Sequence, residues 1–179
     1  MKQVNNKETK HSVTGGKLLL AQPLAETRNS LSEKVRLKVS ALLSVQLLQA
    51  TDLFMQLKQA HWNVTGKNFK SVHELFDEVA EESEEWSDLL AERMRQLGTE
   101  AIGSAAAVVQ GSGLAAYPIG ISAASEHLTA VADRLAHFGK EIRSAIDESS
   151  KLGDADTADI CTSISRAADK ALWMVESHL

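Results

Sequence analysis

The chain is poor in the residues that build disulfides, turns and sheets. Of its 179 residues, one is cysteine, two are proline and 4% are aromatic. The single cysteine, Cys161, excludes a disulfide framework within the chain. Scarce aromatic and proline residues disfavour a β-rich domain, because strands favour aromatic side chains and sheets need many turns. The composition therefore predicts one all-α domain that is long enough to bury a single core.

Long apolar runs are also missing. No apolar stretch reaches the length needed to cross a bilayer, and residues 18–21 are too short for the core of a signal peptide. These absences predict a cytoplasmic protein with no membrane partner. The net charge is mild, at -5.

Three catalytic motifs are absent from the predicted helices. The chain has no Gly-rich phosphate loop and no His-Glu-x-x-His zinc motif, which argues against nucleotide chemistry and hydrolysis. Its one Glu-x-x-His tetrapeptide, Glu8 to His11, precedes the predicted helices, so none of these helices carries the motif that holds a diiron site inside one helical bundle. Redox chemistry at a carboxylate and imidazole site remains.

The apolar periodicity predicts four long helices. The first spans residues 30–64, with Ser30 and Glu33 as a capping box, and the second runs from Asn68 or Phe69 to a C-terminal cap at Gly98. The other two begin at caps that we expect to be Ser122 and Asp156. A long connection, residues 99–118, precedes the third helix and has a short helix over 105–109. Such a crossover is typical of a ferritin-like four-helix bundle.

Residues 1–22 differ from the domain that follows at 23–179. They lack helical or strand periodicity, so we expect a flexible basic N-terminal tail. One interpretation is contact with DNA phosphates, and the other is a solvated leader. The charged residues of this tail are Lys2, Lys7, Lys10 and Lys17 against Glu8.

The segment 58–97 contains the candidate metal ligands, His61, His73, Asp77, Asp88 and Glu92. Imidazoles and carboxylates together suit a divalent transition metal such as iron. His73 and Asp77 are spaced i,i+4 on the second helix, as are Asp88 and Glu92, so each pair shares a helix face.

Distance along the second helix predicts where these ligands meet. Asp77 and Asp88 are separated by about three turns, roughly 16 Å along the axis, which one metal centre cannot span. A second copy lying antiparallel across a two-fold axis near Glu82 would bring the His73 pair of one chain level with the Asp88 pair of the other. The spacing therefore predicts a metal site shared across a two-fold subunit interface.

Several motifs extend over the chain from about residue 30 to the end. They read Gln59-Ala60-His61-Trp62-Asn63-Val64-x-Gly66, Val72-His73-Glu74-Leu75-x-Asp77, Asp88-x-x-Ala91-Glu92-Arg93, Tyr117-Pro118, Asp156-Thr157-Ala158-Asp159-Ile160 and Leu172-Trp173. In these motifs the chain resembles the Dps (DNA protection during starvation) family of mini-ferritins.

The resemblance implies a hollow dodecamer of ferritin-like bundles that acts as a ferroxidase. Such a protein oxidises Fe(II), preferably with hydrogen peroxide, stores ferric oxide and protects DNA during oxidative stress or starvation. It also implies non-specific binding and condensation of double-stranded DNA in the nucleoid. By resemblance, Asp88 and Glu92 with His61 of a neighbour bind a first iron. His73, through water, and Asp77 then bind a second iron that shares Glu92.

Other interpretations stay open. The chain can be a nucleoid-compacting protein in which iron oxidation is secondary, or a non-redox metal-binding bundle. A second set of metal-type residues, Asp133, His137 and Glu141, follows i,i+4 spacing on the third helix, where we interpret it as a solvated face. By resemblance, Glu126 and Asp133 line a subunit pore through which iron enters.

Overall fold

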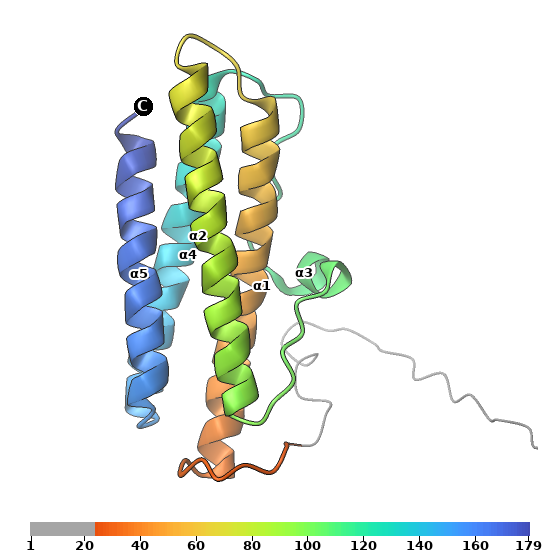
Figure 1. The fold of residues 1–179 in the computed structure, drawn as a ribbon, viewed down its shortest axis with the longest axis vertical. Coiled ribbons are helices and arrows are strands. Elements are labelled where there is room, and N and C mark those ends of the chain that lie inside the picture. The colour runs from red at the N-terminus through yellow and green to blue at the C-terminus, as the bar shows by residue number, and fades with distance from the viewer. Residues whose placement is uncertain (1–23) are drawn as a thin grey trace, which may run out of the picture.

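The computed structural model describes residues 24–179, and five helices occupy this range (Figure 1). The helices are α1 (Glu33–Asn63), α2 (Phe69–Gln96), α3 (Ala105–Gly111), α4 (Ala124–Lys151) and α5 (Ala155–Glu176). The four long helices were predicted, and so was the short α3 within the crossover. The tail with its four lysines lies outside the described residues.

The four long helices form an antiparallel bundle (Figure 1). The chain descends α2 after the α1–α2 turn, returns along the bundle through α3, and then descends α4 and ascends α5. This return places the start of α4 beside the α1–α2 turn, where Thr65 N–H donates to Ser122 O at 2.8 Å and Ala124 N–H donates to Thr65 O at 3.1 Å. The predicted all-α ferritin-like bundle with a long crossover is confirmed.

The core lies between the long helices. Phe76 and Phe138 are completely buried, and the Trp86 ring stacks on Phe138 with 5.5 Å between centroids. Burial of each large apolar side chain contributes about 1.5–3 kcal/mol to the free energy of unfolding. None of the helices described is long and apolar enough to cross a membrane.

Three predicted helix caps are wrong by one or two residues. Ser32, not Ser30, caps α1, and its Oγ accepts from the Val35 N–H at 3.4 Å. Asp154, not Asp156, caps α5, because Asp154 is buried and its Oδ1 accepts from the Thr157 N–H at 3.1 Å.

At α4 the N-cap is Ala123 in place of the predicted Ser122. The backbone N–H of Ala123 donates to the Glu126 carboxylate at 3.2 Å. The hydrogen-bond partner of the N-cap residue is therefore a side chain from the first turn of the helix. The C-cap of α2 is Leu97, and the predicted Gly98 is the residue that follows it. Gly98 has a φ of +89°, and a Cβ there would lie 2.8 Å from the Ala25 carbonyl oxygen.

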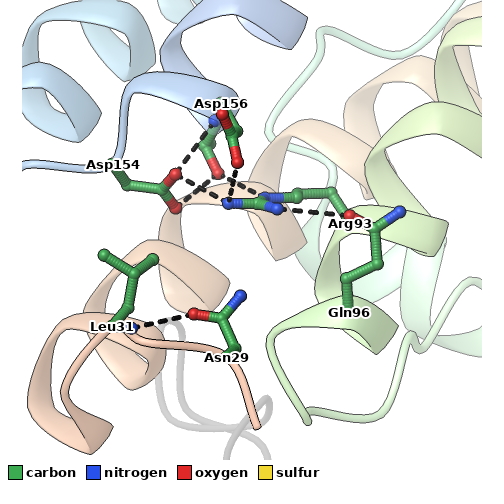
Figure 2. Close-up of polar contacts among 7 residues, drawn as sticks. Asn29, Leu31, Arg93, Gln96, Asp154 and Asp156 are labelled. Atoms are coloured by element: carbon green, nitrogen blue, oxygen red, sulfur yellow. Dashed lines mark hydrogen bonds and ion pairs between the residues drawn. The ribbon is translucent and has the colours of Figure 1, made fainter. Parts of the chain in front are cut away.

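A buried arginine fixes the end of α2 to the start of α5 (Figure 2). Arg93 is 5% exposed, and its guanidinium donates to Asp154 Oδ1 at 2.7 Å and to Thr157 Oγ1 at 2.9 Å. It also donates to Gln96 Oε1 at 3.2 Å and lies 3.8 Å from Asp156 Oδ2. Because Glu92 precedes Arg93 in the same helix, the contacts of Arg93 also fix the rotation of α2 about its axis, and with it the face that carries Glu92.

Candidate metal centre

Two predicted ligands meet at the turn end of the bundle. His61 lies in the last turn of α1 and His73 in the first turns of α2, and their rings stack with 3.6 Å between centroids. The Nδ1 of His61 lies 2.8 Å from the carbonyl oxygen of His73, and the Nδ1 of His73 lies 2.8 Å from the carbonyl oxygen of His61. The structure therefore brings together two histidines twelve positions apart.

These hydrogen bonds determine the tautomer of both rings. A carbonyl oxygen only accepts, so each Nδ1 must carry the hydrogen and donate it. Each Nε2 then has a free lone pair, and the bond at Nδ1 holds the ring in one orientation. This is the usual arrangement of histidines that bind metals.

The turn that pairs the histidines follows from the local sequence. α1 ends at Asn63, and Gly66 has a φ of +128°, which a residue with a side chain rarely adopts. The last carbonyls of a helix have no partner within it, and His73 supplies one for the His61 carbonyl. The same contact thus ends α1 and orients both rings.

Asp77 adds a carboxylate one turn after His73. Its Oδ1 forms an ion pair with the Lys58 ammonium and lies 3.8 Å from His61 Nδ1. The hydrogen bond from Lys58 lowers the pKa of Asp77 most strongly, burial opposes this, and His61 and His73 lower it further. Asp77 is therefore ionised at neutral pH, and a metal ion would compete with Lys58 for it.

Lys58 was missed at the sequence level. It lies three positions before His61 on α1, so the two share a helix face. That spacing was the available signal. The pairing with Asp77, nineteen positions away, depends on how α1 and α2 pack together.

Asp88 and Glu92 lie about three turns further along α2, and both are exposed. Within residues 24–179 of one chain, no three His, Cys, Asp or Glu side chains converge as ligands for a metal ion. A single chain thus presents two separate groups of predicted ligands. One group is His61, His73 and Asp77, and the other is Asp88 and Glu92.

Asp88 borders an open recess of about 490 Å³ between α1, α2 and the crossover. The recess also contains the carboxylates of Glu84 and Glu85 and the hydroxyls of Thr51 and Ser87. It is therefore a negatively charged surface suited to cations or to the ligand-bearing edge of another chain.

The second set on α4 is open to solvent. Asp133 and His137 are exposed and Glu141 is half-buried. This exposure agrees with a solvated helix face.

Comparisons with known proteins agree with this fold. The family model described as a ferritin-like domain matches residues 40–179, so the chain is a ferritin-like protein. It is 41% identical over 154 residues to the DNA protection during starvation protein of Agrobacterium fabrum, covering 86% of this chain and 95% of the relative. The chain belongs to the Dps family of mini-ferritins, whose general roles are iron storage and DNA protection.

Solved structures agree with this assignment. A Mycobacterium smegmatis Dps superposes with a TM-score of 0.83 at 30% identity, covering 87% of this chain and 94% of the other. A Dps from Microbacterium arborescens, described as the high iron form, has a TM-score of 0.78 at 26% identity and covers 87% and 98% of the two chains.

Proposed function

We propose that this protein is a ferroxidase and iron store in which two subunits build each oxidation site. The observation that carries the proposal is the pair of histidines whose Nδ1 atoms are bonded to carbonyl oxygens, which leaves Nε2 as the nitrogen for a metal. Both histidines lie on the same chain as Asp88 and Glu92 but distant from them. Across a two-fold axis, the partner subunit's His61 would reach Asp88 and Glu92 and complete a first iron position. His73, through water, and Asp77 would bind a second iron that shares Glu92.

The ligand chemistry suits the oxidation of iron. Two Fe(II) ions lose one electron each, and one hydrogen peroxide molecule takes up two electrons and two protons to form two water molecules. Carboxylates stabilise the Fe(III) product more strongly than Fe(II) because its charge is higher. Transfer of both electrons in one site avoids release of a hydroxyl radical.

Exposed apolar side chains support a subunit contact on the α1–α2 face. Large apolar side chains exposed on these two helices are Met55, Trp62, Phe69 and Leu89. Exposed apolar surface of this kind often marks an interface. We propose that two-fold dimers formed here assemble into a hollow dodecamer, and that Glu126 and Asp133 line a pore for iron.

The charge distribution supports DNA binding through the tail. Four lysines against one glutamate give residues 1–22 a charge of +3, and because the whole chain is at -5, the remainder carries -8. The body should repel DNA, so Lys2, Lys7, Lys10 and Lys17 would contact the phosphates without reading sequence. Many tails on one particle would raise the effective concentration. We place the protein in the cytoplasm, associated with the nucleoid.

The decisive experiment is anaerobic Fe(II) loading of the assembled particle followed by hydrogen peroxide. We expect ferric absorbance to rise while about one peroxide is consumed per two irons, with the particle mass measured in parallel. A protein that only compacts DNA would neither oxidise iron nor consume peroxide. A non-redox metal protein would bind iron without oxidising it.

A gel-shift salt series tests the tail. Deletion of residues 1–22 should abolish the shift, and the full chain should lose affinity with a log-log salt slope of about -2.7 for each tail engaged. An assembled, truncated particle that shifts DNA equally at every salt concentration would overturn tail-mediated binding.

A further inference from the structure

A third aromatic ring lies against the paired histidines at the start of α2. Phe69 is the first residue of this helix, and its ring contacts the His73 ring with 4.9 Å between centroids and a tilt of 34°. The two rings meet because residues four positions apart share a helix face. His73 also stacks on His61, at 3.6 Å between centroids and an angle of 22° between the ring planes. The His73 ring therefore has one ring contact from α2 and one from α1.

Neither the core nor the start of the helix accounts for Phe69. Its side chain is 44% exposed, so it does not belong to the buried core between the long helices. The N-cap residue, Asn68, makes no side-chain hydrogen bond, and the first turn of α2 has no acidic residue. Helix starts are stabilised by a capping side chain and by acidic residues, and a phenyl ring supplies neither. The contact of Phe69 with His73 therefore calls for an explanation at the metal centre.

The hydrogen bond of His73 fixes one atom of its ring and leaves the tilt of the ring open. Its Nδ1 donates to the His61 carbonyl at 2.8 Å. The torsion χ2 of histidine has broad energy wells, so a single hydrogen bond restrains the ring plane weakly. The Nε2 lone pair lies in this plane, and a metal site requires its ligands within about 10–20° of the productive geometry. Contacts on the faces of the ring supply the missing restraint.

The backbone of Phe69 is itself held by the turn between α1 and α2. The Phe69 N–H donates to the Gly66 carbonyl at 3.1 Å, and Gly66 has the φ of +128° that ends α1. The turn that brings the two histidines together thus also places the phenyl ring beside His73.

We propose that Phe69 is a positioning residue that sets the plane of the His73 ring and so directs its Nε2 toward the second iron position. This inference rests on the proposed function, since it requires His73 to serve that position. Phe69 has no ligand atom and does not touch the metal. Its effect reaches His61 only through the stack with His73, so the second position depends on Phe69 more strongly than the first.

Phe69→Leu tests the inference in the full-length, assembled particle. The change keeps apolar bulk and removes the ring. We titrate both positions without oxidant with Co²⁺, a spectroscopic substitute for Fe(II). The affinity of the second position should fall about fivefold and that of the first by less than about twofold, below the losses of about tenfold or more for partners that bond a ligand directly. Phe69→Tyr keeps the ring and should bind Co²⁺ as the wild type does.

Trp173→Leu is the matched control. It also replaces an exposed aromatic ring, 66% accessible, but on α5, a helix that carries none of the proposed ligands. It should leave both affinities unchanged. All variants are compared at equal particle mass and melting temperature, which separates the positioning of His73 from the proposed subunit contact of Phe69. If Phe69→Leu subunits do not assemble alone, they are mixed into wild-type particles, where the loss should scale with the fraction of variant subunits.

The outcomes separate this inference from the proposed function. Wild-type affinity of the second position in Phe69→Leu, in whole or verified mixed particles, overturns the inference alone. An equal loss in Phe69→Tyr does the same, because the ring is then present without effect. If the wild-type positions bind Co²⁺ no better than those of His61→Ala and Asp77→Ala, the proposed function is wrong, and this inference with it.

Discussion

The two ends of the bundle carry polar clusters of opposite kinds. At one end, Arg93 and Asp154 are buried, and both oxygens of Asp154 and all three guanidinium nitrogens of Arg93 have partners (Figure 2). At the other end, the rings of His61 and His73 are equally well held, but among the described residues each is hydrogen-bonded only through Nδ1. A cluster in which every polar atom is bonded holds helices together, whereas the oriented Nε2 atoms, which have no partner among residues 24–179, are available to a ligand.

The largest expected effect comes from breaking the buried cluster of Arg93 and Asp154. Asp154→Ala leaves the Arg93 cation buried without its main partner, so we expect the free energy of unfolding to fall by about 3–5 kcal/mol. Chemical denaturation measures this. Asp169→Ala is the matched control, because its ion pair with Arg143 has the same length, 2.7 Å, but is exposed. The control should lose at most about 1 kcal/mol. Equal losses would mean that burial of the pair is not what matters.

The next largest effect comes from removing a proposed iron ligand, and it tests whether two subunits share the site. His61→Ala and Asp88→Ala should each slow Fe(II) oxidation at least about tenfold while leaving the melting temperature nearly unchanged. Particles reassembled from equal amounts of both variants should recover up to about a quarter of wild-type activity, because a site that combines the two intact residues forms by chance at that rate. No recovery in a verified mixed particle would place all ligands within one chain.

Lys58 already forms an ion pair with the carboxylate of Asp77, so this carboxylate, unlike the histidine Nε2 atoms, has a partner. Lys58→Met should therefore tighten binding of the second metal ion by about fivefold, which corresponds to about 1 kcal/mol for a partly exposed ion pair. Anaerobic Co²⁺ titration measures both positions. Lys70→Met, which removes an exposed pairing with Glu74, serves as the control. Unchanged second-site affinity in Lys58→Met would show that Lys58 does not compete.

The smallest expected effect is a loss of folding stability at acid pH. Burial lowers the pKa of His127 in the folded protein, so the unfolded chain takes up the proton more readily. Stability should therefore fall as pH drops below the ordinary histidine value of about 6.5. Melting temperatures of wild type and His127→Gln, measured between about pH 7 and pH 5, isolate this contribution from that of the other histidines. A steeper decline in the glutamine variant would contradict it.

Most of the fold was predictable from the sequence, and so was the division of the candidate ligands into two groups on one chain. The helical periodicity located all four long helices, and the small, Gly-rich connection located α3. The meeting of His61 and His73 required the turn at Gly66, whose position predicted a break but not a ring stack. Sharing of the site between subunits remains a prediction.

The sequence alone sets the helices, the faces that the i,i+4 pairs share and the separation of Asp77 from Asp88, because these follow from the regular geometry of one helix. Tertiary contacts, in contrast, select which neighbouring residue caps a helix. Asp154 is chosen over Asp156 because the buried Arg93 pairs with it at 2.7 Å. The contacts of Lys58 with Asp77 and of Tyr117 with His127 were likewise decided by packing, since they join residues on different elements, where spacing along the chain does not set distance in space.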